Sequence, residues 1–261
     1  MNRTKFHKTG KLTIAILLFL STFFIALLAG GCKKSNPAPA TPDTGTMTDR
    51  DGNVYPTVKI GNQWWMAQDL KVRTYQNGDK VILKDSTAGV TWKDTSAGCC
   101  YINLSIGVLY NWYAVMDSRV LIPVGWHLPS DQEWKILEKQ LGMSSVDAEK
   151  VNWRGGDEGD MLKRKKEAIS ISGAWQDSYD VYTIWPNNQS GFTALAGSCR
   201  IFNGLWSDTG IGDTGFWWSS TLAPTPHLEE AWYRYLDYNK GNIFRFYGDK
   251  RYGFSVRCVR D

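Results

Sequence analysis

A long apolar run near the start of the chain limits which residues can build a water-soluble core. From Leu12 to Ala29 the sequence is almost continuously apolar. Four cations and no acid precede the run: Arg3, Lys5, Lys8 and Lys11. A charged start, an apolar stretch and small residues before a cleavage point are typical of a secretory signal peptide. The globular fold must therefore be built from the residues that follow.

The residues directly after this run predict a lipid anchor. Gly30 and Gly31 precede Cys32, a pattern that resembles the lipobox of bacterial lipoproteins. The resemblance implies that diacylglycerol is attached to the Cys32 thiol and that residues 1–31 are removed. Acyl chains such as palmitate then hold the protein on the membrane without spanning it. The alternative is an uncleaved N-terminal membrane helix, because a run of 18 residues is also the lower limit for a span.

Both interpretations place the later residues outside the cytoplasm, because the N-terminal cations stay inside. Lys33, in place of an acidic residue, resembles the sorting context of lipoproteins of the cell outer membrane. Residues 32–48 contain three prolines and almost nothing suited to a core, which is typical of a solvated spacer. We therefore expect a lipidated tether over 32–48 and a single domain over 49–261.

The charge balance excludes one class of partner. The whole chain has 30 Lys and Arg against 26 Asp and Glu, but the four N-terminal cations account for the excess. A nucleic-acid-binding domain needs a basic surface that persists in the folded part. We therefore expect no nucleic-acid partner. The whole chain is 43% hydrophobic, and the part after the apolar run is able to bury a core.

Strand patterns dominate the globular part. Residues 53–60 and 63–66 flank the turn pair Gly61-Asn62 and predict a hairpin. Residues 231–238 and 243–247 predict a second hairpin, and 253–259 alternate with the period of a strand.

One segment carries a complete helix signal. Ser130 and Glu133 form a capping-box pattern, an apolar stripe follows at Trp134, Leu137 and Leu141, and Gly142 ends the pattern. A weaker helix is predicted from Asp157 to Ala168. The sequence thus predicts an α+β domain with a mainly antiparallel sheet and one or two helices.

Several sequence blocks occur in an order that resembles the Fibrobacter succinogenes major paralogous domain family. The blocks are 51–55, 60–67, 110–115, 123–130 with Glu133-Trp134, 191–192, 217–220 and 256–260. The resemblance implies a C-type-lectin-like fold, shared with formylglycine-generating enzymes, in surface lipoproteins without an assigned reaction. The family usually has a cysteine shortly before the Gly-Trp-His block, where this chain has Ile122. Its disulfide pattern therefore does not carry over.

Four cysteines remain besides Cys32. Cys99, Cys100, Cys199 and Cys258 are an even number in a chain predicted to be exported, which favours disulfides. Three connectivities are open, and we expect one or two long-range bridges with Cys258 as a partner. A zinc site is the alternative, but the paired spacing and nearby histidines that zinc uses are missing.

The sequence offers no catalytic constellation. His127 stands before the predicted helix, and no spacing pairs it with a nucleophile, so we expect a structural role. The formylglycine-generating relatives need two reactive cysteines close together in sequence, whereas Cys199 and Cys258 are far apart. We therefore expect a protein without enzymatic activity.

Metal binding is predicted only as an alternative. Asp157, Glu158 and Asp160 supply oxygen ligands suited to calcium, although acids that open a helix usually serve its dipole. We expect no cofactor, with calcium as the alternative.

All thirteen tryptophans follow residue 60. The adjacent pairs Trp64-Trp65 and Trp217-Trp218 lie in predicted strands, so one ring of each pair must point to each face. A buried ring then leaves its neighbour free to cover an edge or meet a ligand. Our candidates for a binding face are Trp206, Trp218, Tyr235, Asp237, Asn239 and Arg245.

The function predicted is that of a non-catalytic lipoprotein that binds an extracellular ligand, for which a polysaccharide is the first candidate. The alternatives are a structural or adhesive envelope component with a protein partner, and an enzyme of the formylglycine-generating type.

Overall fold

The computed structural model describes residues 42–84, 92, 94–103, 107–165, 175, 187–207 and 210–261. The predicted signal peptide, Cys32 and the first part of the predicted tether lie outside the described residues. The compact unit that contains the domain begins at Thr41. Within the described ranges, no helix has both the length and the apolar character needed to cross a membrane.

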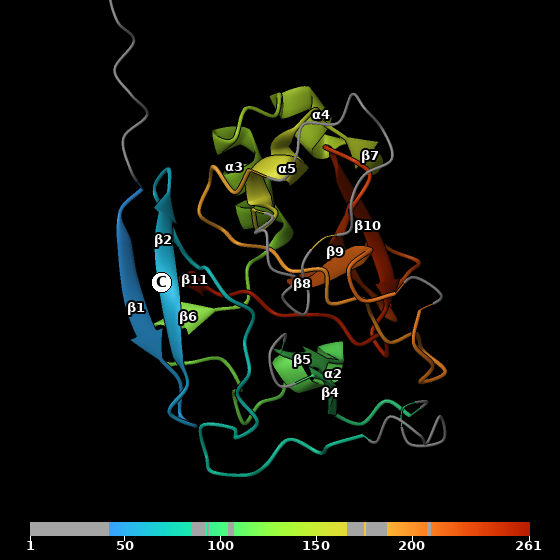
Figure 1. The fold of residues 1–261 in the computed structure, drawn as a ribbon. Coiled ribbons are helices and arrows are strands. Elements are labelled where there is room, and N and C mark those ends of the chain that lie inside the picture. Colours follow the sequence, from blue (N-terminus) through green and yellow to red (C-terminus); the bar gives the residue numbers. More distant parts are fainter. Residues whose placement is uncertain are drawn as a thin grey trace, which may run out of the picture. The chain divides into compact units, whose positions relative to one another are not determined.

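The first sheet has five antiparallel strands in the order β1-β2-β3-β11-β6 (Figure 1). Its strands are β1 (Thr44–Thr48), β2 (Val54–Ile60), β3 (Gln63–Met66), β6 (Trp126–His127) and β11 (Val259–Arg260). The predicted hairpin of β2 and β3 is confirmed, and Gly61 adopts a φ of +60° in its turn. Glycine suits this position because a left-handed backbone costs it little.

Strand β1 changes the expected boundary between tether and domain. Its residues fall within the stretch 32–48, which we predicted to be a spacer, yet it pairs with β2 from Thr44 to Thr48. Met47 is buried in the core. Three β-branched threonines alternate around the strand and favour an extended backbone without any apolar run. The folded part therefore starts before residue 49.

The second sheet has four antiparallel strands in the order β7-β10-β9-β8. They are β7 (Asn152–Arg154), β8 (Thr214–Leu222), β9 (Glu230–Asp237) and β10 (Ile243–Asp249), and the predicted hairpin of β9 and β10 is confirmed. A separate antiparallel pair consists of β4 (Cys99–Asn103) and β5 (Gly107–Tyr110).

The main helix is α3 (Asp131–Gln140), and the predicted capping box of Ser130 and Glu133 is present. The other helices are short: α2 (Trp112–Val115), α4 (Ser145–Glu149) and α5 (Glu158–Leu162). Figure 1 shows α3, α4 and α5 grouped beside β7.

The weaker helix predicted from Asp157 to Ala168 is shorter than expected. It ends at Leu162, after which Lys163 forms a β-bridge with Ala194, and residues 166–168 lie outside the described ranges. The observed architecture is α+β with mainly antiparallel sheets, as the sequence predicts.

Both faces of the first sheet contribute residues to hydrophobic clusters. Tyr55 and Met66 contribute to one hydrophobic cluster, whereas Val58 and Trp65 contribute to another. In the second cluster the rings of Trp65 and Trp134 have centroids 5.0 Å apart, so α3 packs directly on this sheet.

The last segment differs from its prediction as a regular strand. Residues 253–259 are all buried, and only Val259 and Arg260 form a strand. Phe254 bridges to Tyr110, and Ser255 bridges to Trp217. The segment therefore pairs with several different elements. Its apolar and polar residues alternate, but the side chains on both sides of the segment are buried and neither side faces solvent.

Candidate functional site

A cleft lies beside the first sheet, and we call it the tryptophan cleft. It has a volume of about 400 Å³. It is lined by Gly45, Thr46, Met47, Thr57, Trp64, Val124, Gly125, Trp126 and Arg260. Its walls therefore combine two indole rings, two threonines and a guanidinium group.

Strand pairing places the two tryptophans. Trp64 is half-buried and pairs with Lys59 of β2, whereas the next residue, Trp65, points to the opposite face and is fully buried. Trp126 is half-buried and lies opposite Arg260 across the β6–β11 ladder. For the pair Trp64-Trp65, one ring is buried and one lines the cleft, as the alternation predicts.

Gly45 has no side chain, which leaves space in the cleft beside Trp64. A Cβ atom added to it would lie 3.0 Å from Thr57 Oγ1 and 3.7 Å from the ring of Trp64. A larger residue on β1 would therefore enter the space beside Trp64. The sequence prediction did not include Gly45, Trp126 or Arg260, although the alternation of β3 already pointed to Trp64.

Two of the predicted binding residues are buried and do not face solvent. The side chain of Trp218 is fully buried against Phe254, with ring centroids 4.3 Å apart. Arg245 is 5% exposed, and its Nη2 lies 2.7 Å from Asp131 Oδ2. Trp217 is also buried, because β8 has packed layers on both sides. The predicted binding face therefore loses Trp218 and Arg245.

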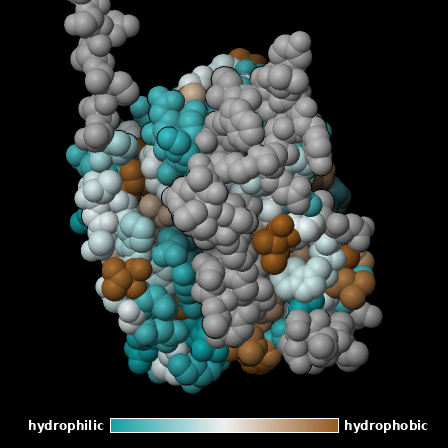
Figure 2. Space-filling view, in the orientation of Figure 1, coloured by the Kyte–Doolittle hydropathy of each residue, from teal (hydrophilic) through white to brown (hydrophobic). Residues whose placement is uncertain are grey.

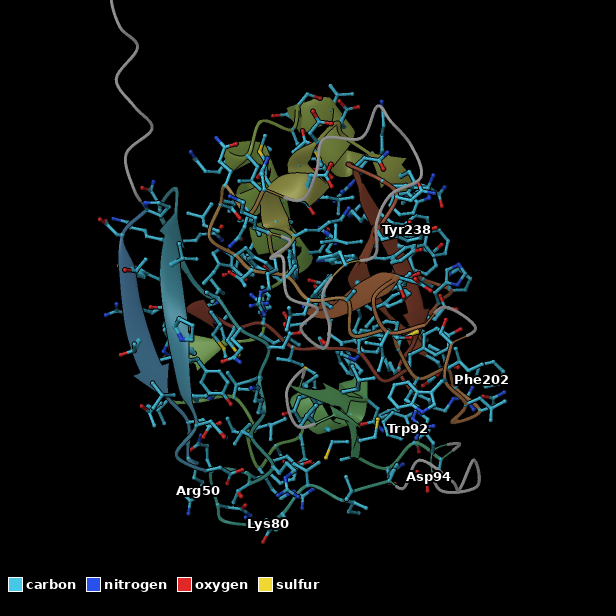
Figure 3. All side chains as sticks on the ribbon, viewed as in Figure 1. Arg50, Lys80, Trp92, Asp94, Phe202 and Tyr238 are labelled. Atoms are coloured by element: carbon cyan, nitrogen blue, oxygen red, sulfur yellow. The ribbon has the colours of Figure 1, made fainter. Side chains whose placement is uncertain are left out.

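Three other predicted residues lie together at the end of β9. Tyr235 Oη donates to Asp237 Oδ2 at 2.7 Å, and Asp237 Oδ1 accepts from the backbone N–H of Asn239 at 3.0 Å. Trp206 packs elsewhere, with the guanidinium of Arg200 4.5 Å from its ring centroid. Figure 3 shows Tyr238 beside the β9–β10 hairpin, where its side chain packs against the second hydrophobic cluster.

Tyr235 belongs to a row of rings that we call the aromatic face. Its half-buried members share one side of the second sheet: Trp153, Phe216, Tyr233, Tyr235, Phe244 and Phe246. Trp153 contacts Tyr235 and Phe244 at centroid distances of 5.0 and 5.2 Å, and Phe216 stacks on Tyr235 at 4.6 Å. Side chains alternate between the two sides of a strand, so the predicted strands 231–238 and 243–247 were enough to place Tyr233, Tyr235, Phe244 and Phe246 on one side of the sheet.

The opposite side of this sheet carries a buried network of charges. Glu138 of α3 binds Arg154 and Arg234 at 2.6 Å each, and Asp131 binds Arg234 and Arg245. Burial raises the pKa of Asp131, but the two arginines outweigh it and hold the pKa well below its usual range. The sequence analysis missed this network, although Asp131 and Glu138 are seven residues apart and therefore share a helix face.

His127 lies between two carboxylates. Its Nε2 atom is 2.7 Å from Glu133 Oε1, and its Nδ1 atom is 2.6 Å from Asp261 Oδ1. Burial lowers the pKa of His127, but the hydrogen bonds to both acids outweigh burial and raise the pKa. The ring thus connects the C-terminal residue to the start of α3.

The four cysteines Cys99, Cys100, Cys199 and Cys258 are buried and unpaired. Burial raises the pKa of Cys99 to about 12, of Cys100 to about 11 and of Cys199 to about 12. The expected long-range bridges are not formed among these residues. Across the described ranges, no three His, Cys, Asp or Glu side chains are grouped to hold a metal ion.

Comparison with known proteins places the domain in a family. The family model of the Fibrobacter succinogenes major domain matches residues 58–260. The chain belongs to this family. No curated protein and no solved structure matches it. The matched part of this Fibrobacter succinogenes major domain runs from within β2 to β11, so it contains Trp64, Trp126 and Arg260 but not β1.

Proposed function

We propose that this Fibrobacter succinogenes major domain is a non-catalytic binding module that holds an extracellular carbohydrate in the tryptophan cleft. The observation that carries the proposal is the presence of two half-buried indole rings and an exposed arginine around one cleft. A volume of about 400 Å³ lies within the range of small-molecule sites, roughly 300–1,000 Å³.

A sugar ring fits this combination of groups. Its C–H bonds form weakly polar faces, which are attracted to the negative face of an aromatic ring. Its hydroxyl groups need partners, and Arg260 supplies donors while the hydroxyl groups of Thr46 and Thr57 donate or accept. Trp64 and Trp126 are attached to strands, so their backbone positions are set before a ligand arrives.

Two features support a role without catalysis. The raised pKa values of Cys99, Cys100 and Cys199 keep these thiols protonated at neutral pH, and a protonated thiol is a poor nucleophile and metal ligand. Both ring nitrogens of His127 are held by carboxylates, which leaves neither to accept a proton from a substrate.

The proposal includes a location. The lipobox pattern at Cys32 and the proline-containing segment after it support a domain tethered by acyl chains to the outer membrane of the cell envelope. A binding module on such a tether reaches ligands outside the cytoplasm.

A protein partner is the second candidate, and the aromatic face favours it. Six half-buried rings from four adjacent strands form a continuous row, and aromatic residues are enriched in protein interfaces. Figure 2 shows one face of the molecule, on which the apolar residues that are not grey lie as separate brown spots.

A glycan array tests the proposal, with the full chain in detergent micelles and calcium both present and absent. Trp64→Ala and Trp126→Ala should each reduce binding of the recognised polysaccharide at least tenfold, because stacking area is lost. Trp153→Ala is the matched control, since this half-buried tryptophan lies on the aromatic face.

Circular dichroism should show that all three variants keep the fold. Absence of binding to every polysaccharide would overturn the proposal. Loss of binding in the Trp153 variant alone would move the site to the aromatic face.

A further inference from the structure

The short helix α5 and the β9–β10 loop are joined by hydrogen bonds. The backbone N–H of Asp160, in α5, donates to the carbonyl of Gly241 at 3.2 Å. Lys163 Nζ donates to Asp160 Oδ1 at 2.9 Å and to the carbonyl of Lys240 at 2.7 Å. The segment that contains α5 and the β9–β10 loop are therefore held in contact.

One carboxylate oxygen in this contact has no partner. Asp160 is 2% exposed, and its Oδ2 atom is buried and makes no hydrogen bond. Leaving a buried charged acceptor unsatisfied is costly, because the oxygen has lost its water without gaining a donor. A group that supplies positive charge or donors at this atom would remove that cost.

Three oxygen atoms converge at this place. They surround the point over the α-carbon of Gly241 that a Cβ atom would occupy. Asp160 Oδ2 lies 3.0 Å from this point, Asp157 Oδ1 lies 3.1 Å from it, and the carbonyl oxygen of Gly156 lies 3.3 Å from it. These are the three nearest atoms outside the glycine and its chain neighbours, and all are acceptors.

We propose that these oxygens form a divalent-cation site that takes Ca²⁺. Calcium binds carboxylates and backbone carbonyls together, in irregular arrangements of six to eight oxygens that include water. Mg²⁺ fits less well because it requires near-ideal octahedral geometry and retains most of its water. Asp157 is exposed, which leaves room for water ligands on the outer side.

The charge of the cluster suits a cation. Asp157 and Asp160 contribute two negative charges, and Lys163 compensates one of them through Oδ1 of Asp160. The remaining negative charge is close to the oxygen that has no partner. Glu158, the third acid of this segment, points elsewhere, because its Oε2 accepts from the backbone N–H of Gly156 at 2.6 Å. The site therefore has two carboxylate ligands instead of the three acids that the sequence grouped together.

A bound cation would fix the loop next to the aromatic face. Lys240 Nζ lies 5.3 Å from the ring centroid of Trp153, at the end of that row of rings. The cation site does not depend on carbohydrate binding in the tryptophan cleft, which is formed by the first sheet.

Terbium luminescence tests the site, because Tb³⁺ replaces Ca²⁺ and is excited through nearby indole rings. Trp175 is suitably placed, with its ring centroid 5.2 Å from Lys163 Nζ. The full chain in detergent is first stripped with a chelator and then titrated with Tb³⁺ alone. We expect saturable emission that excess Ca²⁺ reverses, and a higher melting temperature in Ca²⁺ than in chelator.

Two variants keep the proposal falsifiable without removing the buried partner of Lys163. Asp157→Asn removes an exposed carboxylate and should weaken Tb³⁺ binding about tenfold or more. Gly241→Ala places a methyl group among the three oxygens and should abolish binding. Asp43→Asn, at an exposed position next to β1, is the control and should bind as the unaltered protein does. Absence of saturable emission in the unaltered chain, or equal emission in all variants, would overturn the site.

Discussion

The Nε2 atom of His127 lies 2.7 Å from Oε1 of Glu133, the residue whose other carboxylate oxygen caps α3. Because Asp261 binds the second ring nitrogen, one imidazole ring joins three parts of the chain: β6, the start of α3 and the C-terminal residue. The contact is strongest when the ring is protonated, since both partners are carboxylates.

This arrangement predicts that stability falls as the pH rises. The folded-state pKa of His127 is above its ordinary value of 6.5, so its contribution is complete below pH 6.5 and is lost as the pH passes through the folded pKa. Melting temperatures from pH 5.5 to 8.5 should show this slope, and His127→Gln should flatten it. An NMR titration of the ring that gives a pKa at or below 6.5 would contradict the prediction.

The buried network under α3 predicts a large loss of stability from one substitution. Glu138→Gln removes the carboxylate that binds Arg154 and Arg234, and both guanidinium groups then remain buried with one fewer partner. Breaking a buried ion pair in this way costs about 3–5 kcal/mol. Urea denaturation measures the change in the free energy of unfolding.

Glu149→Gln is the matched control, because Glu149 lies in α4 and pairs with Lys135 of the same helix α3. Glu149 binds Lys135 at 2.8 Å, but its side chain is 64% exposed, so solvent screens the pair. Its removal should cost no more than about 1 kcal/mol. Equal losses in the two variants would show that burial of Glu138 does not determine its contribution.

Local signals predicted much of this fold, and long-range contacts explain what they missed. The capping box at Ser130 and the hairpin around Gly61 depend on residues close in sequence, and both are confirmed. The segment 253–259 has a strand pattern, but its partners are distant elements that no local pattern specifies. Likewise, β1 is recognisable only after β2 provides its pairing edge.

The candidate site was predicted less well than the fold. Alternation identified Trp64 as the ring opposite the buried Trp65, but Trp126 and Arg260 join it only through pairing of β6 with β11. Arg245 was predicted to belong to a binding face, and arginine is rarely fully buried unless it is paired. In the structure, the carboxylate of Asp131 on α3 allows it to be buried.

The cysteines give a prediction that separates free thiols from disulfides. All four are buried and unpaired, so the folded chain should react slowly with iodoacetamide. In denaturant without a reducing agent, Cys99, Cys100, Cys199 and Cys258 should all be alkylated. Mass spectrometry of the digested protein measures the alkylation of each cysteine in the folded and in the denatured chain. A pair that is alkylated only after reduction would show that a bridge forms and would contradict the unpaired state.

The contact between α5 and the β9–β10 loop predicts opposite results for two neighbouring glycines. A Cβ atom on Gly159 would lie 2.6 Å from the carbonyl oxygen of Gly241 and 2.7 Å from that of Asn242. Alanine gains about 1 kcal/mol in helix propensity over glycine, but a clash with rigid backbone costs about 1–3 kcal/mol. Because both contacts are below 3.0 Å, we expect Gly159→Ala to be destabilising overall.

Gly156→Ala provides the comparison, since its nearest neighbour is Glu158 Oε2 at 4.0 Å. This change should be neutral or should stabilise by a few tenths of a kcal/mol, because alanine restricts the unfolded chain. Urea denaturation of both variants gives the difference in the free energy of unfolding. If Gly159→Ala were as stable as Gly156→Ala, α5 would not pack against the carbonyl groups of Gly241 and Asn242. The oxygen cluster over Gly241 would then lose the contact that assembles it.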